Sequence, residues 1–138
     1  MKKSSERRSM TYALVCYSRL GGDIGCLSAL DVYKRISGVW AGNEDIALDV
    51  WAVHECIMFL RLNGEHETIR AIREIYVEPF SKDIHSGITK NEISSRILRF
   101  ALKNNLDERT VYRRLQKARG IWLAIREYGR AKKEGTLK

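Results

Sequence analysis

The chain has 138 residues and a formal net charge of +8, with 44% hydrophobic and 30% charged residues. This composition provides for a hydrophobic core and excludes a wholly disordered chain. No apolar run approaches the roughly 18 residues of a membrane helix, and no apolar stretch of signal-peptide length follows the basic N-terminus, so we expect an intracellular, cytoplasmic protein.

The first third of the chain has the least regular pattern. Residues 1–10 are basic and are expected to form a flexible arm, whereas residues 11–138 are expected to form a single all-α domain. The apolar residues from Leu14 to Tyr17 fit either a short helix or a strand, and glycines interrupt the chain after them. Helical spacing of apolar residues returns between Leu27 and Ile36, which predicts a helix there.

A clearer helix begins at position 43, where Asn43 or Asp45 can cap a first turn that is acidic. The helix is expected to end at Asn63 and Gly64, since both residue types tolerate the left-handed backbone that ends many helices. Between these limits apolar residues recur at spacings of four and three, namely Ile46, Val50, Val53, Ile57 and Leu60.

A second helix is predicted from Glu65 to Val77, with Ile69, Ile72 and Tyr76 on its buried side. Pro79 ends it, because proline lacks a backbone N–H and restricts the residue before it. The two helices make residues 43–78 a support region for the C-terminal part of the chain.

The next helix has a detailed start signal. Thr89 and Glu92 can form a capping box, and Ile88 and Ile93 can clamp the entry of the chain as a hydrophobic staple. The helix is predicted to end at Asn104–Asn105, where asparagine can adopt a left-handed conformation. Its core-facing residues are expected to be Ile97, Phe100 and Ala101.

A similar start signal follows the turn. Asp107 can cap a further helix, and Leu106 can pack on Val111 as a second staple. The apolar face of this helix is predicted to comprise Val111, Leu115, Ala118, Trp122 and Ile125. Its opposite side carries five cations without an intervening acid, namely Arg109, Arg113, Arg114, Lys117 and Arg119.

Two capped amphipathic helices joined by a short turn, the second with a cationic face, predict a helix-turn-helix within residues 88–128. Arginine suits such a face because its planar guanidinium group can donate hydrogen bonds to guanine O6 and N7 together or to two oxygens of a phosphate. Residues 70–138 carry 17 basic and 8 acidic residues, against 8 and 9 in residues 1–69, which also favours an anionic partner such as double-stranded DNA. A helical hairpin with a solvated basic face is the structural alternative.

No residue pattern indicates an enzyme, a cofactor or a metal site. Cys16, Cys26 and Cys56 are widely spaced, and no CxxC or HxxxH spacing supports zinc binding. No nucleophile–base pair or glycine-rich phosphate loop accompanies the three histidines.

With these residues in view, the region from Asp45 to Tyr128 resembles the late-gene antitermination proteins, the Q proteins, of lambdoid bacteriophages. The resemblance follows an order of features. The helix with Asp49 precedes a helix ending in Ile75–Tyr76, and the helix from Ile88 to Ala101 comes next. The motif Arg109-Thr110-Val111-Tyr112-Arg113-Arg114-Leu115 then runs into Trp122-Leu123-Ala124-Ile125.

The resemblance implies that the C-terminal part is similar to the promoter −35-reading domain of sigma factors. A Q-like protein would bind DNA beside a late promoter, load onto paused bacterial RNA polymerase and let it bypass pauses and terminators in the host cytoplasm. RNA polymerase, with its sigma factor, and further copies on DNA would be partners, and no membrane would be involved. The implied DNA-facing residues are Arg109, Thr110, Arg113, Arg114 and Lys117.

Two alternatives remain open at this point. A helix-turn-helix repressor or activator that acts at initiation would share every feature named above, with its N-terminal half as the dimerisation unit. An RNA-binding protein could use the same basic face, with Tyr112 stacking on a base, although Tyr112 also suits the edge of the helical core.

Overall fold

The computed structural model describes residues 10, 12–14, 16–18, 20, 29–77 and 90–133. Within these ranges all regular structure is helical, which confirms the predicted all-α class. The predicted basic arm lies, apart from Met10, outside the described residues, as do Ile88 and Thr89 of the predicted start signals.

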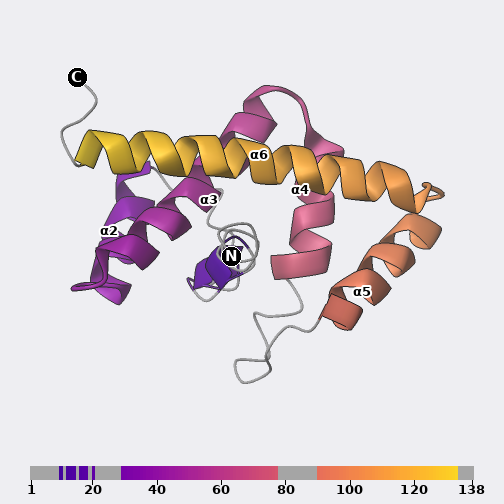
Figure 1. The fold of residues 1–138 in the computed structure, drawn as a ribbon, viewed down its shortest axis with the longest axis horizontal. Helices are drawn as coiled ribbons and strands as arrows, with labels where there is room; N and C mark the ends of the chain where they lie inside the picture. The colour runs from indigo at the N-terminus through magenta and orange to yellow at the C-terminus, as the bar shows by residue number, and fades with distance from the viewer. Residues whose placement is uncertain are drawn as a thin grey trace.

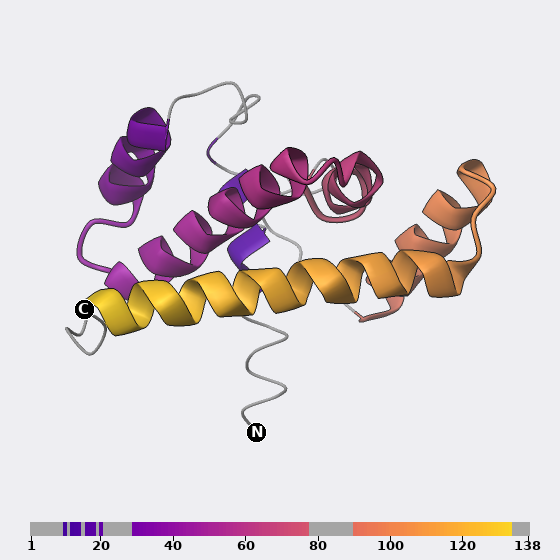
Figure 2. The ribbon, with the colours of Figure 1, turned by 90° about the horizontal axis from the view of Figure 1, so that it is seen from above.

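One long helix, α6 (Glu108–Lys133), runs along the whole molecule in Figure 1. Its 26 residues span about 39 Å. Seen from above in Figure 2, α3 lies beside the C-terminal part of α6, while α5 packs at its N-terminal end. The other elements, in chain order, are α2 (Ala29–Val39), α3 (Glu44–Leu62), α4 (His66–Ile72), a π-helical turn η2 (Arg73–Val77) and α5 (Lys90–Lys103).

Both predicted ends of α3 are confirmed. Asn43, rather than Asp45, is the cap: its Oδ1 accepts a hydrogen bond from the backbone N–H of Ile46 at 3.4 Å. At the other end, Asn63 donates its side-chain N–H to the carbonyl of Phe59 at 2.8 Å, and Gly64 has a φ of 71°. These contacts satisfy backbone groups that a helix end leaves without partners.

The predicted helix from Glu65 to Val77 changes form after Ile72. The wider π-helical turn of η2 rotates the following side chains relative to an α-helix, because it places more residues in each turn. Ile75 therefore takes the buried position expected for Tyr76, which is only half-buried. Ile69 and Ile72 are buried as predicted.

The main core lies between α2, α3, α4, the helical residues near position 14 and the middle of α6. Trp122 of α6 is 0% exposed and donates its indole N–H to the carbonyl of Asp49 at 3.0 Å. Cys56 donates its thiol to the carbonyl of Ala118 at 3.4 Å, and burial raises the pKa of this thiol to about 12. The core also includes Leu14, Val32, Ile36, Val50, Val53 and Leu60.

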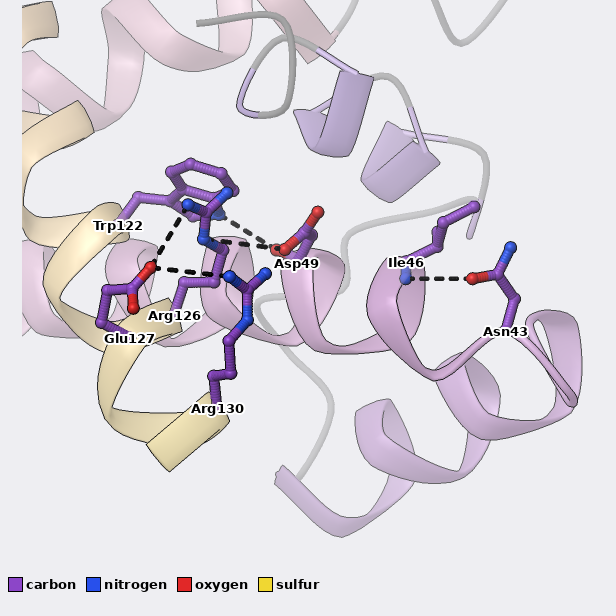
Figure 3. Close-up of polar contacts among 7 residues, drawn as sticks. All are labelled: Asn43, Ile46, Asp49, Trp122, Arg126, Glu127 and Arg130. Atoms are coloured by element: carbon purple, nitrogen blue, oxygen red, sulfur yellow. Dashed lines mark hydrogen bonds and ion pairs between the residues drawn. The ribbon is translucent and has the colours of Figure 1, made fainter. Parts of the chain in front are cut away.

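A charge cluster around the buried Arg126 side chain lies between α3 and α6 next to Trp122 (Figure 3). The Arg126 guanidinium lies 4.7 Å from the Trp122 ring centroid, and its Nε is 4.0 Å from Oδ1 of Asp49. Glu127 accepts from Arg126 at 3.4 Å and pairs with Arg130 at 3.8 Å. Burial raises the pKa of Asp49, and the nearby arginines oppose this shift. Within this cluster the pair between Arg126 and Asp49 is the ion pair that links α6 to α3.

His54 of α3 is buried in the main core, where its Nδ1 lies 3.2 Å from the Tyr17 hydroxyl. Burial lowers the pKa of His54 below its ordinary 6.5. The unfolded chain therefore binds this proton more tightly than the folded chain does. Between pH 7.5 and 5.5 we expect His54 to make stability fall as the pH drops below about 6.5, by at most about 1.4 kcal/mol per pH unit.

Urea unfolding of the His54→Gln variant at several pH values measures this contribution, because the other groups titrate in both proteins. The variant should lose part of the pH dependence, whereas substitution of the exposed His66 should preserve it. Equal pH dependence in His54→Gln and the parent would contradict the assignment.

Candidate nucleic-acid interface

A second, smaller core holds the N-terminal part of α6 against α5 and η2. Leu115 and Tyr76 pack against this small core and also against the main core, so α6 belongs to both. Ile97, Phe100 and Ala101 are buried as predicted. The small core consists of Ala71, Ile75, Ile97, Phe100, Ala101 and Val111.

The turn between α5 and α6 has the predicted left-handed residue. Asn105 has a φ of 53°, and Asn104 donates its side-chain N–H to the carbonyl of Phe100 at 2.9 Å. The backbone N–H of Leu106 then donates to the carbonyl of Ala101 at 2.8 Å. The turn thus satisfies carbonyls at the end of α5 and redirects the chain within a few residues.

We expect Asn105→Val to destabilise the protein by about 1–2 kcal/mol, because a β-branched residue is poorly accommodated in the left-handed region. Asn105→Gly should preserve stability within about 0.5 kcal/mol, since glycine adopts this conformation readily. Urea unfolding of both variants checks the pair. Equal stability of the valine and glycine variants would contradict a conformational role for Asn105.

Asp107 caps α6 as predicted. Its Oδ1 accepts a hydrogen bond from the backbone N–H of Arg109 at 3.0 Å, and its carbonyl accepts from Val111 at 3.4 Å. Leu106 packs against the small core that contains Val111, in agreement with the predicted staple. The cap and the staple fix where α6 starts and how it leaves the turn.

Two of the five predicted DNA-facing residues lie on the open side of α6. Arg109 and Arg113 are exposed and four residues apart, so they share one stripe opposite the buried Val111 and Ala118. Gln116 is exposed at a position three residues after Arg113, on the same side. Gln116 was not among the predicted DNA-facing residues, which were four cations and Thr110, although its spacing from Arg113 already placed it on this side of the helix. The side-chain amide of glutamine can accept a hydrogen bond from adenine N6 and donate one to adenine N7.

The other three predicted residues lie on the flank of α6 that faces the start of α4. Lys117 is exposed but pairs with Glu65, with 2.7 Å between its Nζ and Oε1. This hydrogen bond holds the pKa of Glu65 below its ordinary value. Thr110 and Arg114 are half-buried, and the Arg114 charge also acts on Glu65. The structure therefore separates the five residues into an open pair and a flanking group.

Exposed cations also surround the small core on α4, η2 and α5. Glu74 of η2 pairs with Arg70 at 3.2 Å and with Lys103 at 3.1 Å. Arg73 and Arg99 are exposed. The basic surface is therefore not restricted to α6, as the charge of the C-terminal half predicts.

The described residues contain no group of three or more histidine, cysteine, aspartate or glutamate side chains arranged to hold a metal ion. Nor is any helix among them long and apolar enough to cross a membrane. Comparisons of the chain with protein-family models, curated proteins and solved structures return no match.

Proposed function

We propose that the chain is a sequence-specific DNA-binding protein and that α5 and α6 form its helix-turn-helix. The exposed stripe of Arg109 and Arg113 at the start of α6, directly after the Asn105 turn, carries this proposal. The small core packs α5 against the side of α6 that lies opposite this stripe.

The dimensions of this surface suit the major groove. The cationic run from Arg109 to Lys117 covers about 12 Å of helix, comparable with the groove width of about 12 Å. Arg113 could reach guanine O6 and N7. Gln116, on the same stripe of α6, could reach an adenine base. The positive end of the helix dipole near Thr110 favours a phosphate there. Lys117 and Arg114, on the flank, are suited to phosphate contacts.

We further propose that this DNA binding serves transcription antitermination in a bacterial host cytoplasm, with RNA polymerase as the second partner and without enzymatic activity of the chain itself. The support is the resemblance of residues 45–128 to phage Q proteins. Loading onto promoter-proximally paused polymerase would then begin at α6, and the N-terminal half would meet the polymerase.

Single-round transcription through a terminator tests this function. The template carries a late promoter and its flanking DNA from the genome that encodes the protein, with purified host polymerase. We expect increased readthrough that depends on the promoter-proximal DNA and is lost with Arg113→Ala. Unchanged readthrough with blocked or stimulated initiation would instead make the protein a conventional repressor or activator.

A further inference from the structure

The acidic residue Glu65 stands at the N-terminal end of α4 without capping that helix. Its side chain makes no capping hydrogen bond to the backbone of α4. Serine, threonine, asparagine and aspartate are the side chains preferred at such a position, because their shorter side chains reach the first backbone N–H groups. The start of α4 therefore does not depend on a hydrogen bond to the Glu65 carboxylate.

The carboxylate of Glu65 instead reaches α6, 52 residues further along the chain. Its Oε1 accepts a hydrogen bond from Nζ of Lys117 at 2.7 Å, a length typical of a charge-assisted hydrogen bond. This hydrogen bond and, to a smaller extent, the charge of Arg114 lower the pKa of Glu65. One acid thus acts on two of the five residues that were predicted to face DNA.

Lys117 lies beside the exposed stripe of α6. It follows Arg113 by four residues, which places it one turn further along the helix and about 40° around it. Its side chain is 56% exposed, so the pair with Glu65 is at the surface and open to solvent. Because a lysine side chain is long and flexible, the ammonium group can turn either to Glu65 or to a phosphate beside the stripe.

We propose that Glu65 is an internal counterion that withholds Lys117 from the phosphates of DNA. The proposal rests on the proposed function, because it requires DNA to lie on the exposed stripe of α6. Carboxylate and phosphate oxygens are both anionic acceptors, so either can take the same ammonium group. A phosphate that approaches Lys117 must displace Glu65 and is also repelled by the carboxylate.

This competition affects the sequence-independent part of DNA binding. Phosphate contacts position a protein on DNA but carry no sequence information directly. Glu65 therefore lowers the affinity for any duplex, and the base contacts proposed for Arg113 and Gln116 supply a larger share of the binding free energy. The effect is moderate in size, because ion pairs at a protein surface are individually weak.

Fluorescence anisotropy of the full chain with a random duplex of about 20 base pairs, over a series of salt concentrations, tests the proposal. We expect Glu65→Gln to bind about 3- to 10-fold more tightly than the parent at about 100 mM salt, because Lys117 is then available to a phosphate. The slope of log Kd against log salt concentration should also increase by about 0.9, the contribution of one further neutralised phosphate.

Glu67→Gln is the matched control for the change in net charge. Glu67 is an exposed acid of α4, two residues beyond Glu65. Its substitution should change Kd by less than about twofold and leave the slope unchanged, because solvent screens a charge that is not paired with the stripe. Lys117→Ala is the second control: in this background Glu65→Gln should no longer increase the slope, because the cation that it would release is absent.

Glu65→Asp separates the effect on DNA from any effect on folding. Aspartate keeps the charge and is a preferred cap residue, so the variant should fold. Its side chain is one methylene shorter than that of glutamate and therefore reaches Lys117 less well. We expect this variant to bind the duplex more tightly than the parent and less tightly than Glu65→Gln.

Each remaining outcome would contradict the competition. Equal Kd values for Glu65→Gln and Glu67→Gln, or weaker binding by Glu65→Gln, would overturn the proposal and leave Glu65 as a link between α4 and α6. An increased slope that persists with Lys117→Ala would overturn it as well, because Glu65 would then act on another cation. A parent chain that binds no duplex at any salt concentration would overturn the proposed function, and this proposal with it.

Discussion

Replacing Trp122 with alanine should lower the free energy of unfolding by about 3–5 kcal/mol, the range for removing a fully buried aromatic side chain. Trp122 is completely buried, and its loss would leave a cavity between α3 and α6. It would also remove the hydrogen bond to the Asp49 carbonyl and the ring beneath the Arg126 guanidinium. The whole free energy of unfolding of a domain of this size is only about 5–15 kcal/mol, so the variant should be close to unfolding at 37 °C.

Urea unfolding followed by circular dichroism measures this effect, with Trp122→Phe as the conservative control. Phenylalanine keeps most of the apolar volume but cannot donate to Asp49, so it should cost less than alanine, about 1–3 kcal/mol. A loss below about 1 kcal/mol for Trp122→Ala would show that α3 and α6 do not pack around this residue.

Replacing Arg113 with alanine should weaken specific DNA binding by about 1–3 kcal/mol, roughly a 5- to 150-fold rise in Kd, as expected for a lost bidentate base contact. Binding to random DNA should weaken less, because it depends on phosphate contacts. Folding should be unaffected, since Arg113 is exposed on the open side of α6. Fluorescence anisotropy at one fixed salt concentration, with specific and random duplexes, measures both affinities.

Lys132→Ala is the matched control for Arg113→Ala. Lys132 is an exposed cation on the same helix but lies beyond the cationic run. It should leave both affinities nearly unchanged. If Arg113→Ala weakens specific and random binding equally, Arg113 contacts only phosphate. If neither affinity changes, the stripe is not the DNA surface.

Local signals in the sequence predicted much of the fold. The caps at Asn43 and Asp107 and the left-handed turn at Asn105 depend on residues within a few positions of each other, so they could be read without the tertiary structure. The same holds for the buried stripe that includes Phe100 and Val111, because helical periodicity fixes which residues share a face.

Features that depend on packing could not be read from the sequence. The π-helical turn at Ile75 and the pair between Lys117 and Glu65 arise where α4 and η2 meet other helices. The helical periodicity of α6 also did not indicate that this helix would pack into both cores. The predicted capping box at Thr89 stays a prediction.

Selection of bound duplexes from a random DNA library, followed by probing of guanine N7 with dimethyl sulfate, is the most direct test of DNA reading by α6. We expect the parent chain to enrich one motif and to protect guanine N7 within it, because that atom lies in the major groove. Arg113→Ala should lose the protection at one position of the motif. Absence of an enriched motif, or a motif that the variant binds with unchanged protection, would contradict the assignment of α5 and α6 as a sequence-reading helix-turn-helix.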